Sequence, residues 1–331
     1  EIMKRIFMIA LIAVTLLAMI GCVSGPPAMD SFEKDQGVVM PYLMFGDKTE
    51  GEHDSEAYLF DAPKPIGADS QGNIYVGGKK FLLTKYTSDG EFVKILAERG
   101  DDDGQINYVK GIACNSMDYI YATDSINKRI NVFDADGNWL RSFGEEGNGP
   151  GQFSDIGPLT IDADDNLYVS DDDNGVVVFD KDDNYIKNIG VKGEDAGQTS
   201  EFGWLATDAD LRQLYVAVDG LGKIDVYDMD SGELKFDMGG LGNGPGMWEE
   251  DIEGLAVGPW GLIFAMDEAG GNIKVFQGDG TFVTQWGKAG LYDGELASSE
   301  CIAYDPLNRR IIVADEKNYR VVSFTLDSLG F

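Results

Sequence analysis

A repeat with a nearly constant period runs through most of this chain. Short apolar runs recur at intervals of 46–49 residues. Their aliphatic anchors are Ile74, Ile120, Leu167, Leu214, Ile263 and Ile311. A second, aromatic series keeps the same step about a dozen residues later, at Tyr86, Phe133, Phe179, Tyr227, Phe276 and Phe324. Two series in step indicate one supersecondary unit copied along the chain, which constrains the fold more than composition does.

Each unit contains the signals of four short strands. Another apolar start lies eight or nine residues before every anchor. Turns such as SDGE (88–91) and ADGN (135–138) follow the aromatic series, and Asp-Gly between apolar runs is typical of a hairpin. A further strand then ends at pairs such as Phe143-Gly144 and Trp286-Gly287. A four-stranded antiparallel unit repeated about one axis is the blade of a β-propeller.

The last unit lacks its fourth strand. It has strands at 301–305, 310–315 and 319–324, and the given sequence ends at Phe331. The segment VVMPYLMFG (38–46) ends in Phe45-Gly46, as the other fourth strands do. We therefore predict an all-β fold over residues 38–331: a six-bladed β-propeller of four-stranded antiparallel blades, closed by an N-terminal strand that joins the last blade. Pro41 suits an outermost strand, where its missing N–H faces solvent.

Two segments resemble the NHL repeat. These are NKRINVF (127–133) and GNGPGQF (147–153), and partial copies follow at GNGPGMW (242–248) and at 318–321. The resemblance covers roughly residues 38–331 and implies the propeller fold. It implies little about function, because that family includes binding scaffolds, lyases and envelope proteins without a defined role.

The amino terminus is typical of an export signal. Lys4 and Arg5 precede an apolar run over 6–20, and MIGC (19–22) resembles a bacterial lipobox. We expect residues 1–21 to be a lipoprotein signal peptide, Cys22 to carry the lipid, and 22–37 to be a flexible tether. Val23 in place of Asp favours the outer membrane. An ordinary signal peptide without lipid is the alternative.

The charge is strongly acidic, with 58 Asp and Glu against 26 Lys and Arg. Such a surface repels nucleic acid, which proteins bind largely through cationic contacts to phosphate. It also repels anionic lipid, so we expect membrane contact only through the anchor. The excess of carboxylates serves solubility or high salt, or else attracts cations and cationic partners.

Propeller ligands usually bind at one mouth of the central channel, so the entry to each innermost strand matters. The residues two before each entry are Lys64, Lys110, Gly157, Gly203, Glu253 and Glu300. In blade order they predict a polarised rim with a positive and a negative side. Such a rim suits a zwitterionic or dipolar ligand or a peptide; unrelated surface charges are the alternative. Trp204 is expected to line the channel, or to form a stacking platform.

A second ring follows each second strand and contains four aspartates. They are Asp124, Asp171, Asp267 and Asp315. A carboxylate at such a position accepts backbone N–H groups of the following turn. The alternative is a carboxylate-lined mouth for Ca²⁺ or a cationic ligand, since hard cations take oxygen ligands.

Catalysis has little support in the sequence. The only histidine, His53, lies in a link before the first blade, whereas zinc sites and His-based triads need histidine in the site. Cys114 and Cys301 fall on innermost strands two blades apart, too far for a disulfide. The sequence therefore predicts a monomeric, lipid-anchored binding module that presents its mouth or rim to an envelope protein, a peptide or a small ligand. The alternative is a metal-assisted hydrolase or lyase that uses mouth carboxylates.

Overall fold

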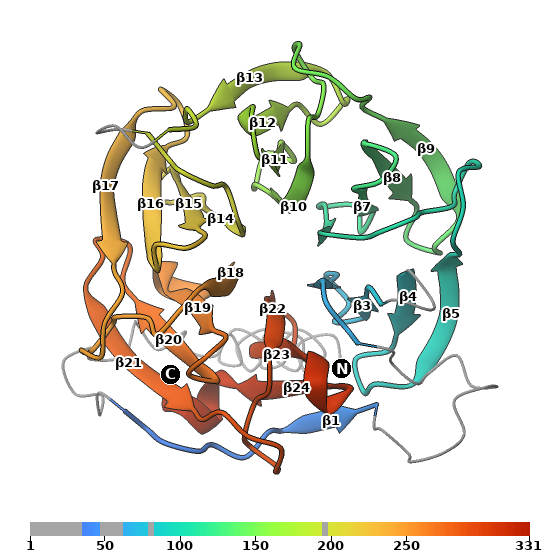
Figure 1. The fold of residues 1–331 in the computed structure, drawn as a ribbon. Helices are drawn as coiled ribbons and strands as arrows, with labels where there is room; N and C mark the ends of the chain where they lie inside the picture. Colours follow the sequence, from blue (N-terminus) through green and yellow to red (C-terminus); the bar gives the residue numbers. More distant parts are fainter. Residues whose placement is uncertain (1–34, 47–61, 79–82, 194–197) are drawn as a thin grey trace, which may run out of the picture.

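The computed structural model describes residues 35–46, 62–78, 83–193 and 198–331. The predicted signal peptide, Cys22, most of the tether and His53 lie outside these ranges. Within them the chain forms six four-stranded antiparallel sheets round a common centre (Figure 1). No helix among the described residues is long and apolar enough to cross a membrane.

Every blade has the same strand order from the centre outwards, and blades are numbered here from β2. The innermost strands are β2 (Ile66–Ala68), β6 (Ile112–Cys114), β10 (Ile156–Ile161), β14 (Leu205–Asp208), β18 (Ile252–Val257) and β22 (Ser299–Asp305). The second strands are β3 (Ile74–Val76), β7 (Ile120–Asp124), β11 (Leu167–Asp171), β15 (Gln213–Val218), β19 (Ile263–Asp267) and β23 (Arg310–Asp315). The predicted aliphatic anchors all lie on these second strands.

The outer half of each blade carries the aromatic series and the outermost strand. The third strands are β4 (Leu83–Tyr86), β8 (Arg129–Phe133), β12 (Gly175–Phe179), β16 (Lys223–Asp228), β20 (Asn272–Phe276) and β24 (Arg320–Thr325). The outermost strands are β5 (Phe92–Ala97), β9 (Trp139–Phe143), β13 (Tyr185–Ile189), β17 (Leu234–Gly239), β21 (Phe282–Gly287) and β1 (Leu43–Phe45). The predicted fold class is confirmed, since four strands recur in each of six blades.

Ring closure uses the N-terminal strand, as predicted. β1 pairs antiparallel with β24, with Leu43 opposite Ser323 and Phe45 opposite Val321. In Figure 1 this strand lies outermost in the last blade, beside β24. Hydrogen bonding of the N-terminal segment to the propeller begins at Gln36, within the expected flexible tether of residues 22–37. The Gln36 N–H donates to Gln285 O (2.8 Å), and the Gly287 N–H donates to Gly37 O (2.8 Å), so the segment also joins blade five.

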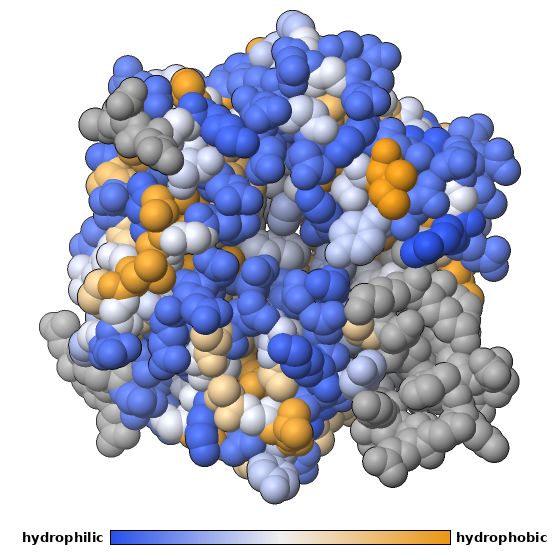
Figure 2. Space-filling view, in the orientation of Figure 1, coloured by the Kyte–Doolittle hydropathy of each residue, from blue (hydrophilic) through white to orange (hydrophobic). Residues whose placement is uncertain are grey.

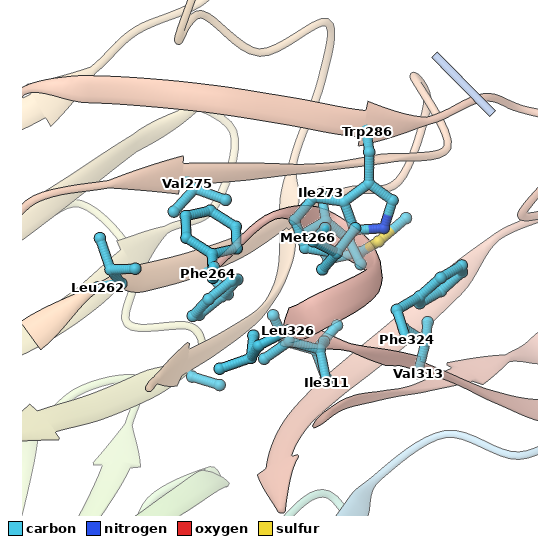
Figure 3. Close-up of a cluster of buried hydrophobic side chains, with 14 of the residues drawn as sticks. Leu262, Phe264, Met266, Ile273, Val275, Trp286, Ile311, Val313, Phe324 and Leu326 are labelled. Atoms are coloured by element: carbon cyan, nitrogen blue, oxygen red, sulfur yellow. The ribbon is translucent and has the colours of Figure 1, made fainter. Parts of the chain in front are cut away.

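The core lies between neighbouring blades, because each sheet is apolar on both faces and buries them against the next sheet. Figure 3 shows one such interface, between blades five and six. Phe264, Trp286 and Phe324 meet there edge to face, with ring centroids 6.0–6.1 Å apart. All three side chains are fully buried. A blade alone would expose this surface, which explains why the repeats need one another.

The links between blades return the chain from the outer edge to the centre. Within GEEGNGPGQF, the Gly147 N–H donates to Phe153 O and the Phe153 N–H donates to Glu145 O, both at 2.9 Å. Gly144 has φ of +91°, and a Cβ there would lie 2.6 Å from the Phe153 ring. The glycine that ends the outermost strand therefore allows both the turn and the seating of the phenylalanine.

Candidate functional site

The predicted entry positions meet in one cavity at the mouth of the channel. All six, from Lys64 round to Glu300, line a space of about 240 Å³. Figure 2 shows one face of the ring, with a central hollow surrounded mainly by hydrophilic residues. The strands bring these positions together because each innermost strand starts at the same end of the ring. The cavity holds acidic residues that were not among the predicted ones: Asp155, Asp172, Glu201 and Asp219.

Both lysines on the predicted positive side of the mouth form ion pairs with carboxylates. Lys64 Nζ lies 2.8 Å from Glu300 Oε1 and 3.7 Å from Glu316 Oε2. Lys110 Nζ lies 3.4 Å from Asp155 Oδ2. Each lysine is thus neutralised by a carboxylate of a neighbouring blade. Six carboxylates and two lysines line the cavity, so acidic groups outnumber basic ones there.

Trp204 lines the channel, as the sequence predicted. It borders the mouth cavity and also a second chamber of about 430 Å³ on the other side of the ring. Its half-buried ring packs against apolar clusters on both sides of the channel, around Ile252 of blade five and around Cys301 of blade six. The indole Nε1–H donates to Glu253 Oε2 at 3.2 Å. Trp204 therefore forms the floor of the mouth cavity and is fixed to its acidic wall.

The pKa values of two mouth carboxyls are shifted toward neutrality. Burial raises the pKa of Asp219 to about 7, with further contributions from the charges of Glu201, Asp251 and Asp172. Burial also raises the pKa of Glu253 to about 7; the charges of Glu300 and Asp219 add to this, while the Trp204 hydrogen bond opposes it. Both carboxyls change charge near neutral pH.

The carboxylate of Glu300 belongs to the same acidic wall. Burial raises its pKa, and so does its hydrogen bond with Glu316. Asp155 behaves in the opposite way. Burial raises the pKa of Asp155, but the hydrogen bond from Lys128 and the charge of Lys110 together hold it below its usual value. Negative charge is therefore disfavoured beside Trp204 and favoured at the lysine-rich edge.

The four predicted mouth aspartates lie elsewhere. Asp124, Asp171, Asp267 and Asp315 are fully buried and do not line the cavity. Asp171 accepts from the N–H groups of Ser154 (2.8 Å), Asp155 (3.0 Å) and Asn174 (3.0 Å). Their carboxylates hold the turns, which is the first of the two predicted roles. The alternative, that these four residues line a mouth for Ca²⁺ or a cationic ligand, is wrong, because none of them borders the cavity. No group of three or more His, Cys, Asp or Glu side chains among the described residues is placed to hold a metal ion.

Buried cations complete these turn-holding sites. Arg320 Nε donates to Asp315 Oδ2 at 2.8 Å, and the Lys274 ammonium is paired with Asp267. Arg129 Nε lies 3.6 Å from Asp124 Oδ2. A basic residue on the third strand thus reaches back to the aspartate that ends the second strand. A buried carboxylate is stable only with such partners.

Two of the residues that directly follow the turn-holding positions, Asp172 and Asp219, line the mouth cavity. At that place the chain has Ser125, Asp172, Asp219, Glu268 and Glu316. Neighbouring side chains point to opposite sides of an extended chain, so a step of one residue turns a buried group into a mouth group. In blade four the turn-holding aspartate is replaced by buried Val218. Blade one also lacks an aspartate at this position, where it has Gly78, but the next residue there is Lys79. Asp219 is recognisable because blade four has its aspartate one residue after the position without one.

The two cysteines in the described part of the chain are free, as predicted from the blade order. Cys114 on β6 is half-buried, and Cys301 on β22 is buried. Burial raises the pKa of both thiols, and nearby carboxylates raise it further. Cys114 lines the second chamber rather than the mouth. Neither thiol is activated as a nucleophile, since an active thiol needs a lowered pKa.

Comparison with known proteins supports the fold. A family described as "6-bladed beta-propeller" matches residues 93–175, from β5 to the start of β12. No curated protein matches the chain. A gluconolactonase, XC5397 from Xanthomonas campestris, matches with TM-score 0.59 and 12% identity, over 86% of this chain and 97% of the other. Hydrazine synthase of Kuenenia stuttgartiensis matches with TM-score 0.55 and 11% identity, over 84% and 98%. The sequence repeat, the strand order and these structures agree on a six-bladed β-propeller.

Proposed function

We propose that this protein is a binding module of the cell envelope, anchored by a lipid on Cys22, whose mouth cavity holds a small ligand or a segment of a partner protein. The proposal rests on one observation. All six blades contribute to one cavity of about 240 Å³ that combines charged side chains with an aromatic floor. Concave sites with a few convergent polar groups are the usual place for ligands. The MIGC segment supports export and anchoring.

The ring suits binding because it is rigid. Inner strands fixed at both ends hold the mouth residues in place, and a preorganised site loses little entropy when it binds. The metal-assisted hydrolase or lyase has less support, because the acidic ring on which it relied is buried in turns. A divalent ion bound stoichiometrically at the mouth would favour that alternative.

Charge reversal at the mouth tests the proposal. The full acylated chain is used to capture material from its own membranes, and the captured protein and small molecules are identified by mass spectrometry. Lys110→Glu breaks the ion pair with Asp155 (3.4 Å) and places two carboxylates against each other, which disrupts the geometry of that edge of the mouth. We expect it to lower recovery of the bound species at least about tenfold, as ~1.4 kcal/mol of lost binding would do.

The matched control is Lys181→Glu, the same change at an exposed side chain on the turn between β12 and β13. It is expected to leave recovery unchanged. Equal recovery with wild type and Lys110→Glu, or an equal loss with both variants, would contradict a mouth site. Metal analysis of the same samples reports on the hydrolase or lyase alternative.

A further inference from the structure

We infer that the mouth cavity takes an organic cation: an ammonium or guanidinium group of the ligand, bound against the indole of Trp204 and between the carboxylates of Glu253 and Asp219. The inference rests on the proposed function, and it adds the chemical class of the group that enters the cavity. Three features of the cavity support it: the aromatic floor, two carboxylates without a cationic partner, and lysines that are already paired.

The aromatic floor is held in place. Trp204 packs against apolar residues of opposite sides of the channel, and its Nε1–H is bonded to Glu253. Trp204 lines the mouth cavity as well as the second chamber. Cations are attracted to the face of an aromatic ring, most strongly to that of tryptophan. A carboxylate fixed to the same indole adds charge at its edge.

The second carboxylate has room beside the floor because residue 203 is a glycine. A Cβ on Gly203 would lie 2.4 Å from Asp219 Oδ1 and 3.1 Å from Ala217 O. Among the described residues, Asp219 makes no hydrogen bond or ion pair, and only the more distant charge of Lys110 favours its ionised form. The one hydrogen bond to the Glu253 carboxylate comes from Trp204. Two half-buried carboxylates therefore lie at the cavity without a basic partner, and a ligand cation would supply it.

The lysines of the cavity do not fill this role. Lys64 is held by Glu300 and Glu316, and Lys110 by Asp155. The two lysines belong to blades one and two, whereas Asp219 belongs to blade four and Glu253 to blade five. The positive charges are thus confined to one edge, and the part of the cavity above Trp204 stays acidic.

The same features favour an organic cation over a metal ion. Ca²⁺ takes six to eight oxygen ligands. The described residues contain no group of three or more His, Cys, Asp or Glu placed to hold a metal. An indole contributes nothing to metal coordination, whereas it stabilises a weakly hydrated organic cation. The cavity of about 240 Å³ has room for a head group, so the rest of the ligand would extend out of the mouth.

Calorimetry with defined probes tests the inference. The full mature chain in detergent is titrated at pH 8 with tetramethylammonium chloride, with calcium chloride, and with neutral tert-butanol, all at constant ionic strength. We expect one saturable site for tetramethylammonium, and none at comparable concentration for the other two. Trp204→Leu and Glu253→Gln are each expected to weaken binding at least about tenfold.

The matched control is Asp210→Asn, which removes one exposed carboxylate at the opposite end of blade four. It is expected to bind as wild type does. The inference is overturned if tetramethylammonium does not saturate, if tert-butanol or Ca²⁺ binds as well, or if Glu253→Gln binds unchanged. Glu253→Gln keeps the test decisive if Trp204→Leu fails to fold.

The two proposals fail separately. If tetramethylammonium does not bind but Lys110→Glu still loses the species captured from membranes, the mouth is a binding site for another chemical class. If both results are negative, the mouth is not the site at all. If tetramethylammonium binds and also displaces the captured species, the mouth site and its preference for an organic cation are both supported.

Discussion

Asp315→Ala is expected to lower the free energy of unfolding by about 3–5 kcal/mol, because it removes the buried carboxylate that pairs with Arg320. The exposed carboxylate of Asp293, 3.4 Å from the Arg320 guanidinium, does not replace it. The Asp315 carboxylate is fully buried, and it accepts from the Ala297 N–H (2.7 Å), Asn318 Nδ2 (2.8 Å) and Arg320 Nε (2.8 Å). The Arg320 side chain is only 10% exposed. Loss of the carboxylate therefore disrupts both the turn and the last blade.

Chemical denaturation of the full chain, followed by circular dichroism, measures this effect. Asp327→Ala is the control, because that side chain is exposed near the end of the chain, and we expect a change within about 0.5 kcal/mol. The double variant Asp315→Ala/Arg320→Met is expected to recover part of the lost stability, since it also removes the buried guanidinium that Asp315 neutralises. A loss below about 1 kcal/mol for Asp315→Ala would mean that this aspartate does not hold the turn.

Asp219→Asn is expected to make the protein more stable at pH 8 by about 1–3 kcal/mol, as removal of a poorly solvated charge should. The pKa of Asp219 is about 7 in the folded chain, against about 3.9 for a solvated aspartate. Between these values the folded state binds a proton that the unfolded state lacks. Stability therefore falls as the pH rises through this window, and it is lowest above pH 7.

Thermal or denaturant unfolding at pH 8 and at pH 4.5 resolves the prediction. The variant should exceed wild type at pH 8 and approach it at pH 4.5, where Asp219 is protonated in the fold. Asp210→Asn, exposed in the same blade, should show no such pH dependence. A variant that is less stable than wild type at pH 8 would show that Asp219 has a stabilising partner. If Asp219→Asn is more stable than wild type and also binds tetramethylammonium more weakly, Asp219 shows the usual behaviour of a functional residue.

The fold was predictable because the repeat carries redundant information. Each copy has its own apolar anchor, aromatic residue and turn, so an error at one position leaves the period intact. Closure followed from an imbalance: the last unit lacked a strand, and Phe45-Gly46 matched the missing one. The hydrogen bond that ties Gln36, in the expected tether, to the propeller was not predictable. The Gln36 N–H bonds to a carbonyl of blade five, which no local pattern encodes.

The charges of the mouth were predictable in position but not in effect. Lys64 and Glu300 stand at equivalent places in the repeat, yet their pairing depends on the contact between the first and last blades. The predicted aspartates hold turns, whereas the acidic residues Asp172 and Asp219, one position further along, line the mouth. Periodicity locates a turn more reliably than it locates the direction of the side chains in that turn. Asp219 stood out only as an irregularity, where Val218 replaces the expected aspartate.

The most direct test of the mouth as the ligand site is a crystal structure of the full mature chain soaked in tetramethylammonium at several times its dissociation constant. The account predicts electron density for one cation in the mouth cavity, against the Trp204 indole and within reach of the Glu253 and Asp219 carboxylates. An empty mouth, with the cation ordered elsewhere on the ring or in the chamber below Trp204, would contradict it.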